Sequence, residues 1–260
     1  MKKTWSKFWH KGGPPAAAVL LFLVVWQVYT EVSGIEPWIL PSPLSIFTET
    51  VRIFPELVNH TASTIKVAVI GYSIAAAFGI VFSILLRAVF PALKRPLYPL
   101  LIISQCIPTI VLAPLFVSWF GYGWPPKIII ITLVCFFPIM ISALQGYENA
   151  DPAMRNYMLM IGASRRQVFR KLEWPSALPY LFSGLRVSTT YSVMAAIIAE
   201  WLGTKEGLGL AMRIYESAFR RDRVLACVLI IIAFSLIFVG LIAGLEKMVM
   251  RWRPARKEDL

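Results

Sequence analysis

Residues 224–246 read VLACVLIIIAFSLIFVGLIAGLE, and this stretch decides which fold the chain can adopt. It is rich in Ile, Leu, Val, Phe and Ala and carries no charge before its last residue. A helix needs about 20 apolar residues to cross the hydrocarbon core of a bilayer. The stretch therefore predicts a membrane-spanning helix.

Runs of the same character precede this stretch. They cover about 15–31, 62–86, 97–120, 128–147 and 178–202. Lys66 and Arg186 lie within two of them, each close enough to a run end for its side chain to reach the interface. The first run follows four lysines, as in a signal peptide, but no convincing cleavage site follows it, so we expect a retained span. The expected fold class is all-α, a polytopic membrane protein with six transmembrane helices.

The composition of the whole chain agrees with a membrane protein. Apolar residues make up 58% of the 260 residues and charged residues only 15%, against about 45–50% and about 25% in soluble domains. A soluble enzyme or a DNA-binding domain of this composition would expose too much hydrocarbon to water. An aromatic content of 13% excludes disorder.

The distribution of positive charge predicts the orientation. With the N-terminus in the cytoplasm, the segments on that side hold 17 Lys and Arg residues and the outer segments hold 7. Cytoplasmic loops of membrane proteins are enriched in these residues. We therefore expect cytoplasmic ends at 1–14 and 251–260 and a single transmembrane domain over 15–250.

Residues suited to catalysis or metal binding do not form a recognisable site. Cys106, Cys135 and Cys227 lie far apart inside apolar runs, and His10 and His60 lie outside the runs. This is neither a disulfide framework nor a zinc pattern. No glycine-rich phosphate loop with its lysine occurs either. We expect no catalytic residue, no metal site and no cofactor bound by this chain.

Two outer segments have the pattern of short helices. In 35–58 the apolar residues fall on one helical stripe, after Ser42-Pro43 as N-cap and first helical position. Segment 204–223 repeats the helical spacing. We expect both helices to lie flat on the outer surface, where they either have a function or seal the rim.

The inner segment 148–176 predicts a first amphipathic helix. Asp151-Pro152 is a strong helix start, because it combines an N-cap with a proline at the first position. The apolar stripe of this helix consists of Met154, Tyr157, Met158 and Ile161. Gly162 then interrupts the pattern.

A second short helix follows in the same segment. Ser164 can cap it, with Gln167 at the capping-box position, and Pro175 is expected to end it. The helix pair is too polar to enter lipid. It is either an interfacial loop whose arginines face phosphate groups or an element that docks on a partner.

The spacing from Gly162 over nine residues to Leu172-Glu173-Trp174-Pro175 resembles the cytoplasmic signature of permease subunits of binding-protein-dependent ABC importers. That signature reads Glu-Ala-Ala, three residues, Gly, nine residues, Ile-x-Leu-Pro. Residues 156–158 stand at the Glu-Ala-Ala positions, so the acidic residue is absent. The resemblance implies that a kinked helix pair docks on an ATPase. The residues it assigns to this contact are Asn156, Tyr157, Met158, Gly162, Ala163, Ser164, Leu172 and Pro175.

Further motifs indicate the branch of the family. Leu40-Pro41-Ser42-Pro43, Ala113-Pro114-Leu115-Phe116 and Ala199-Glu200-Trp201-Leu202-Gly203 are similar to those of nitrate, sulfonate, taurine and thiamine-precursor permeases. Within that branch, Ser183-Gly184-Leu185-Arg186 and the preceding residues most resemble permeases for hydroxymethylpyrimidine-type thiamine precursors. The transported solute is expected to depend largely on another subunit.

The resemblance implies a type I importer in a bacterial inner membrane. Two permease subunits, identical or related, would enclose the path, two ATPases would bind ATP and Mg, and a soluble receptor would deliver the solute from outside. The chain itself would not be an enzyme. A stand-alone secondary transporter is the alternative, and it predicts inverted repeats or broken, ion-binding spans, none of which is evident.

Polar residues at membrane depth are candidates for lining the path, because such groups must face protein or water. The candidates are Gln105, Thr109, Thr189, Thr190, Tyr191 and Glu200. Hydrogen bonding between helices is the alternative for the hydroxyl groups. For Glu200, an outer gate and an ion pair with a nearby arginine are both open.

An outer basic cluster departs from the charge distribution of the rest of the chain. It consists of Arg213, Arg220, Arg221 and Arg223. Contact with anionic lipid headgroups is one explanation. Docking of acidic residues on the receptor is the other, and we adopt it as the hypothesis.

Overall fold

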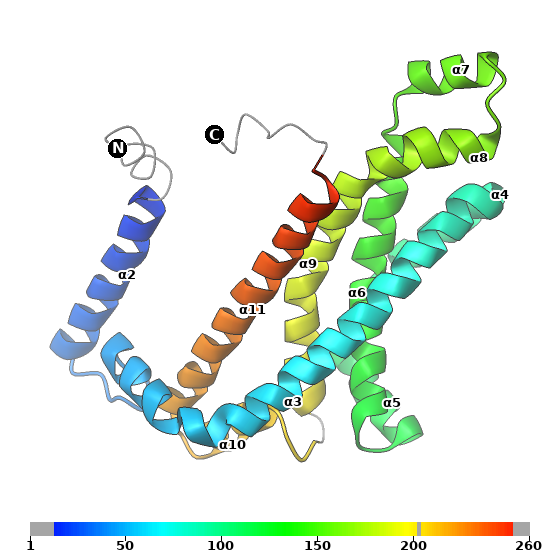
Figure 1. The fold of residues 1–260 in the computed structure, drawn as a ribbon. Helices are drawn as coiled ribbons and strands as arrows, with labels where there is room; N and C mark the ends of the chain where they lie inside the picture. Colours follow the sequence, from blue (N-terminus) through cyan, green and yellow to red (C-terminus); the bar gives the residue numbers. More distant parts are fainter. Residues whose placement is uncertain (1–12, 202–203, 252–260) are drawn as a thin grey trace. The chain divides into compact units, whose positions relative to one another are not determined.

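The computed structural model describes residues 13–201 and 204–251, except for the side chains of residues 94, 95, 104, 105, 109 and 110. All regular structure in this part of the chain is helical (Figure 1). The elements are α2 (Gly13–Val32), α3 (Pro43–Ile84), the π-helical turn η1 (Leu85–Val89), α4 (Pro91–Gln105), α5 (Thr109–Phe120), α6 (Trp124–Glu148), α7 (Pro152–Met160), α8 (Arg165–Val168), the π-helical turn η2 (Phe169–Glu173), α9 (Trp174–Trp201), α10 (Leu208–Ser217) and α11 (Arg221–Val249).

The all-α fold class is confirmed. Five helical stretches are long and apolar enough to cross a membrane: Gly13–Val32, Pro43–Val89, Trp124–Glu148, Arg165–Trp201 and Arg221–Val249. The remaining apolar run is divided between α4 and α5 rather than forming one continuous helix.

The division of this run follows from Pro108. The helix α4 closes at Cys106, whose backbone N–H donates to the carbonyl of Ile103 at 3.0 Å. Pro108 has extended dihedral angles, φ −61° and ψ 116°, and α5 begins directly after it. A proline disfavours the helical conformation of the residue before it, so a helix tends to end there.

The expectation of a separate short helix within 35–58 is wrong. Helix α3 begins at Pro43, as the cap predicted, but it continues through Pro55 to Ile84. Residues 56–64 contain neither glycine nor proline, so no residue there stops the helix. The expectation for 204–223 agrees better with the structure, because α10 is a short helix of 10 residues.

The chain divides into two compact units. The first comprises residues up to 58 together with 211–230, and the second comprises 59–210 together with residues from 231 onward. Helices α3, α10 and α11 contribute residues to both units. The sites described below each lie within one unit.

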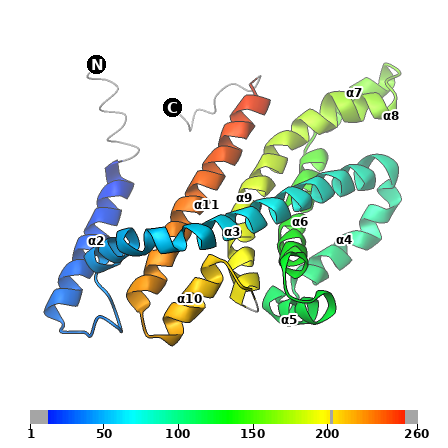
Figure 2. The ribbon, with the colours of Figure 1, turned by 60° about the horizontal axis from the view of Figure 1, so that its bottom comes forward.

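Helices α6 and α9 form the centre of the second unit, where they lie side by side (Figures 1 and 2). Their buried apolar side chains form two clusters, and the larger one includes Ile139, Met140 and Leu144 of α6 and Leu181 and Leu185 of α9. Van der Waals packing of these side chains against each other stabilises the pair and fixes the ends of α9 relative to α6.

Small residues allow the backbones of α6 and α9 to approach closely. A Cβ atom on Gly184 would lie 2.8 Å from the side chain of Ser142 and 2.9 Å from the carbonyl of Pro138. Ser188 donates to the carbonyl of Cys135 at 3.1 Å, and the thiol of Cys135 donates back to the carbonyl of Ser188 at 3.3 Å. Close packing and short polar bonds of this kind hold helices together in lipid, where the hydrophobic effect between helices is absent.

Candidate functional site

Residues 148–176, which we call the coupling segment, contain both of the predicted caps. Asp151 caps α7, because its Oδ1 accepts from the backbone N–H groups of Ala153 (2.8 Å) and Met154 (3.4 Å). Ser164 and Gln167 form the reciprocal capping box at the start of α8. Both caps are therefore confirmed, and they fix where each helix begins.

Gly162 makes the turn between the two helices. Its φ is +85°, in the left-handed region that favours glycine. The N–H of Gly162 donates to the carbonyl of Leu159 at 3.1 Å, and that of Ala163 donates to Met158 at 2.9 Å. These two bonds are a Schellman motif, so the interruption expected at Gly162 is a defined helix end.

Helix α7 presents an apolar surface with no partner in the described part of the chain. None of its residues is buried. Tyr157 is 56% exposed and Met160 is 81% exposed, and Met154 and Leu159 are exposed as well. Contiguous exposed apolar groups mark contact surfaces.

The predicted coupling residues are distributed over both helices and the turn. Asn156, Tyr157, Gly162 and Ser164 are exposed, whereas Met158, Ala163, Leu172 and Pro175 are half-buried.

The prediction that Pro175 ends the second helix is wrong. Helix α8 passes through η2 into α9, so Arg165–Trp201 is one continuous helical stretch. A proline lacks the N–H that a regular helix needs. A π-helical turn leaves out one hydrogen bond of the regular helical backbone. The turn η2 leaves out this bond immediately before Pro175.

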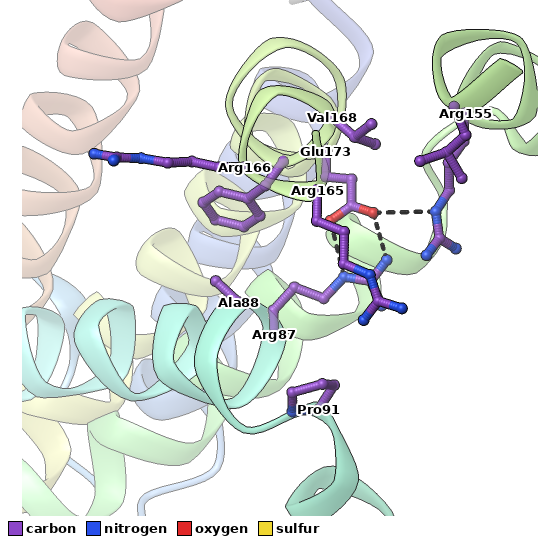
Figure 3. A pocket seen from close by; sticks show the side chains of 10 residues that line it. Arg87, Ala88, Pro91, Arg155, Arg165, Arg166, Val168 and Glu173 are labelled. Atoms are coloured by element: carbon purple, nitrogen blue, oxygen red, sulfur yellow. Dashed lines mark hydrogen bonds and ion pairs between the residues drawn. The ribbon is translucent and has the colours of Figure 1, made fainter. Parts of the chain in front are cut away.

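Glu173 connects three parts of the second unit (Figure 3). It lies on η2 with its side chain buried, and its two oxygens accept from Nη2 (2.6 Å) and Nε (2.9 Å) of Arg87 on η1. Nε of Arg155 on α7 lies 3.5 Å from Oε1 of Glu173. A bidentate arginine–carboxylate pair fixes orientation as well as distance. Glu173 therefore ties the exposed helix α7 to the adjacent ends of α3 and α9.

A hollow of about 660 Å³, which we call the basic hollow, opens beside this pair. Its charged walls are Arg87, Arg155, Arg165, Arg166 and Glu173, and its apolar walls are Ala88, Pro91, Leu159, Val168 and Phe169. Four arginines and one carboxylate thus line the hollow. In the described part of the chain the side chains of Arg165 and Arg166 make no hydrogen bond or ion pair.

A second buried carboxylate, Glu200, lies at the other end of the same helical stretch. The hydroxyl of Thr64 on α3 donates to Glu200, with distances of 2.9 and 3.0 Å to the two carboxylate oxygens. The backbone N–H of Gly209 donates to Oε2 at 2.9 Å. Among the described residues no arginine forms an ion pair with Glu200, so of the two roles left open the structure does not form the ion pair.

The loop before α10 is held by the same network. The N–H of Leu208 donates to the Thr64 hydroxyl at 2.8 Å, and the N–H of Gly207 donates to Nδ1 of His60 at 3.1 Å. Lys127 on α6 is buried and donates to the hydroxyl of Thr204. The loop is therefore anchored to α3, α6 and α9.

The other path candidates differ in exposure. Thr189 is buried and donates to the carbonyl of Leu185 at 2.8 Å. Thr190 and Tyr191 are exposed on α9. The side chains of Gln105 and Thr109 lie outside the described residues. Which of these groups line a path stays a prediction.

Two arginines of the outer basic cluster bind carboxylates of their own chain, within the first unit. Oε1 of Glu49 accepts from Arg220 (3.0 Å) and from Arg223 (2.8 Å). Arg220 also binds both oxygens of Asp222, at 2.8 and 3.1 Å. The hydrogen bonding to Asp222 raises the pKa of Arg220 above its usual value.

The other two arginines of the cluster have different surroundings. The guanidinium carbon of Arg221 lies 6.0 Å from the ring centroid of Trp38, and its Nη1 donates to the carbonyl of Ile39 at 3.3 Å. Arg213 is exposed.

Sequence reasoning missed two carboxylates that hold these contacts, Glu173 and Glu49. Glu173 stands at the variable position of the signature, and Glu49 lies in a segment interpreted only for its apolar stripe. One signal was available, because Glu173 and Glu200 are the only acidic residues in 165–201. Acidic residues so placed are costly to bury and need partners.

Comparison with known proteins gives the following. The model of the family described as "binding-protein-dependent transport system inner membrane component" matches residues 75–251. The formylaminopyrimidine transport permease protein ThiX of Halalkalibacterium halodurans is 33% identical over 240 residues, which cover 92% of this chain and 95% of ThiX. The taurine transport system permease protein TauC of Escherichia coli is 30% identical over 241 residues, 89% of this chain and 86% of TauC.

A solved structure shows the same fold. The crystal structure of an amino acid ABC transporter with histidines contains a chain that matches with a TM-score of 0.62, covering 80% of this chain and 98% of that one. The sequences are 15% identical, so this likeness concerns the fold alone.

Proposed function

The chain belongs to the family of binding-protein-dependent transport system inner membrane components, and from this premise we propose that two copies of it enclose the translocation path of an ABC importer. It is a membrane-embedded permease subunit, and the resemblance to the branch that includes thiamine-precursor and taurine permeases is confirmed. In the proposed assembly the chain does not hydrolyse ATP. ATP and Mg are bound by two partner ATPases.

The exposed apolar surface of α7 is the observation that carries the proposal. We assign the contact with the ATPase to α7 and the turn after it, with Tyr157 and Gly162 at its centre and the other coupling residues around them. Met160 is 81% exposed beside them. Glu173 then transmits movement of α7 to α3 and α9, because it binds Arg155 and Arg87 at once. Packed elements that move as rigid bodies transmit small displacements in this way.

Replacing one exposed tyrosine at each end of the unit tests this contact. Tyr157→Asp should lower the amount of ATPase that co-purifies and abolish most transport, because a charge would enter an apolar interface. Tyr122→Asp is the matched control, since Tyr122 is 78% exposed on the turn between α5 and α6. Equal co-purification of the ATPase with both variants would refute the assignment.

We further propose that the exposed face of α9 contributes to the path. Thr190 and Tyr191 are exposed there, and polar groups at membrane depth must meet protein or water. Glu200 and Thr189 contribute indirectly, since both have partners inside the subunit. The thiol of a Tyr191→Cys variant should react with a small polar thiol reagent in the assembled transporter, whereas that of an Ile232→Cys variant, on the apolar α11, should not.

The proposed solute is a small organic molecule of the thiamine-precursor type. The support is the 33% identity with ThiX over nearly the whole chain. A sulfonate, taurine or nitrate permease is the alternative, supported by the 30% identity with TauC. Calorimetric titration of the cognate soluble receptor with a pyrimidine precursor and with taurine distinguishes the two.

The proposed orientation places both termini and α7 in the cytoplasm and α10 outside. The receptor would then approach the outer basic cluster. Because Arg220 and Arg223 bind Glu49, we centre the docking proposal on Arg221. Arg221→Glu should raise the receptor concentration that gives half-maximal ATPase stimulation, most clearly at low salt. Labelling of single cysteines from one side of the membrane tests the orientation independently.

A further inference from the structure

We infer that the basic hollow binds the phosphate group of an anionic phospholipid from the leaflet at the α7 end of the molecule. This leaflet is the cytoplasmic one in the orientation proposed above. The inference concerns lipid and does not depend on which solute is transported.

The charge balance of the hollow is the first argument. Glu173 is the one carboxylate among its lining residues, and both of its oxygens are bound by Arg87 at 2.6 and 2.9 Å. Arg155 reaches the same carboxylate only at 3.5 Å, and Arg165 has no partner in the described part of the chain. Guanidinium groups held this close repel one another, so a bound anion would lower their energy.

The direction of the side chains is the second argument. Figure 3 shows the guanidinium groups of Arg87, Arg155 and Arg165 gathered on the same side of the hollow, whereas Arg166 points away. They come from η1, α7 and α8. Because each arginine offers several N–H donors in a planar fork, three of them can surround the oxygens of one phosphate group.

An exposed apolar turn beside the hollow favours a lipid over a free anion. Ala88 and Pro91 form one wall of the hollow. Val89, Phe90 and Leu93, next to them in the chain, are about half exposed, at 54%, 51% and 48%. The stretch Pro43–Val89, apolar enough to span the bilayer, ends among these residues. A ligand with an anionic head and hydrocarbon chains matches both surfaces, as basic pockets between membrane helices do for anionic lipids.

Native mass spectrometry of the full-length chain tests the inference. The protein is purified in detergent and offered equal amounts of phosphatidylglycerol and phosphatidylcholine with the same acyl chains. The wild type should retain phosphatidylglycerol in preference. Arg165→Gln should reduce this preference about fivefold, the effect of one basic group near an anionic headgroup, and Arg165→Lys should restore most of it.

Arg170→Gln is the matched control. Arg170 is an exposed arginine on η2 that does not line the hollow, so its loss should leave the preference unchanged. An equal loss in this variant would show a general charge effect and overturn the inference. Unchanged preference in Arg165→Gln would overturn it too. Displacement of the lipid by millimolar glycerol 3-phosphate would assign the hollow to a free phosphate instead.

The ATPase is the competing partner for Arg165. If Arg165→Gln retained the lipid preference but lost the ATPase on co-purification, the hollow would be a protein contact and the lipid inference would be wrong. Retention of the ATPase together with loss of the lipid preference is the expected result.

Discussion

Glu173 and Glu200 are buried carboxylates near opposite ends of one helical stretch, and they are held in different ways. Glu173 is surrounded by guanidinium groups of Arg87 and Arg155. Glu200 accepts hydrogen bonds from uncharged donors, the hydroxyl of Thr64 and the backbone N–H of Gly209. The first connects η2 to η1 and α7 through charged side chains, and the second connects α9 to α3 and to the start of α10.

The difference indicates which end of the Arg165–Trp201 stretch can follow a movement and which is fixed. An ion pair depends on the positions of long side chains, which can follow a moving helix such as α7. A carboxylate bound to a short hydroxyl and to backbone permits little movement, because every partner is fixed to its own backbone. We therefore expect the α7 end to transmit motion, and the loop before α10 and the start of α10 to stay in place.

The largest expected effect comes from removing the buried ion pair at the Glu173 end of the Arg165–Trp201 stretch. Glu173→Ala leaves the guanidinium of Arg87, 19% exposed, without its counter-charge, and removing one partner of a buried pair costs about 3–5 kcal/mol. Thermal unfolding of the purified protein in detergent should show this loss. The double variant Arg87→Met/Glu173→Met should recover most of it, since an apolar pair leaves no unpaired charge. A double variant as unstable as Glu173→Ala would contradict the comparison.

A matched substitution at both carboxylates sharpens the contrast. Glu173→Gln should cost about 2 kcal/mol, because hydrogen bonds to charged groups lose their ionic part. Glu200→Gln should cost about 1 kcal/mol or less, since an amide oxygen still accepts from a neutral donor. The measurement is again thermal unfolding. Equal losses at the two positions would mean that the partners of Glu200 are effectively charged.

The smallest expected effect concerns the uncharged capping box of α8, which lies at the same end as Glu173. Ser164→Ala removes the hydroxyl that caps α8 and should cost about 1 kcal/mol. Gln167→Ala removes the reciprocal half of the capping box and serves as its partner variant. If transport falls in proportion to these small losses, the caps contribute only stability. A complete loss of transport at normal stability would give the α8 start a direct role at the ATPase.

Much of the fold could be predicted from local pattern. The apolar runs, the cap at Asp151 and the capping box at Ser164 each depend on residues a few positions apart, and all are present. The division of the third run was less accessible. A proline such as Pro108 in a membrane helix either bends it or ends it, according to the neighbouring helices.

The organising contacts of the candidate site could not be predicted in the same way. Arg87 and Glu173 are 86 positions apart, and Glu49 and Arg220 are 171 apart. Nothing in the sequence near either carboxylate identifies its partner, because the pairing depends on which helix ends meet. For this reason the sequence alone suggests that the outer arginines are available for docking, whereas in the structure Arg220 and Arg223 bind Glu49.

The π-helical turn η2 has a consequence for the lengths that this segment can tolerate. Such a turn contains one residue more than the α-helical turn it replaces, and each residue of an α-helix advances the side chains by about 100° around the axis. Deleting a single residue within 169–172 would restore a regular helix and rotate Arg165 out of phase with Glu173 and α9. We therefore expect this joint to accept exchanges of side chains more readily than any change in the number of residues, so that chains with the same architecture keep the count between Gly162 and Pro175.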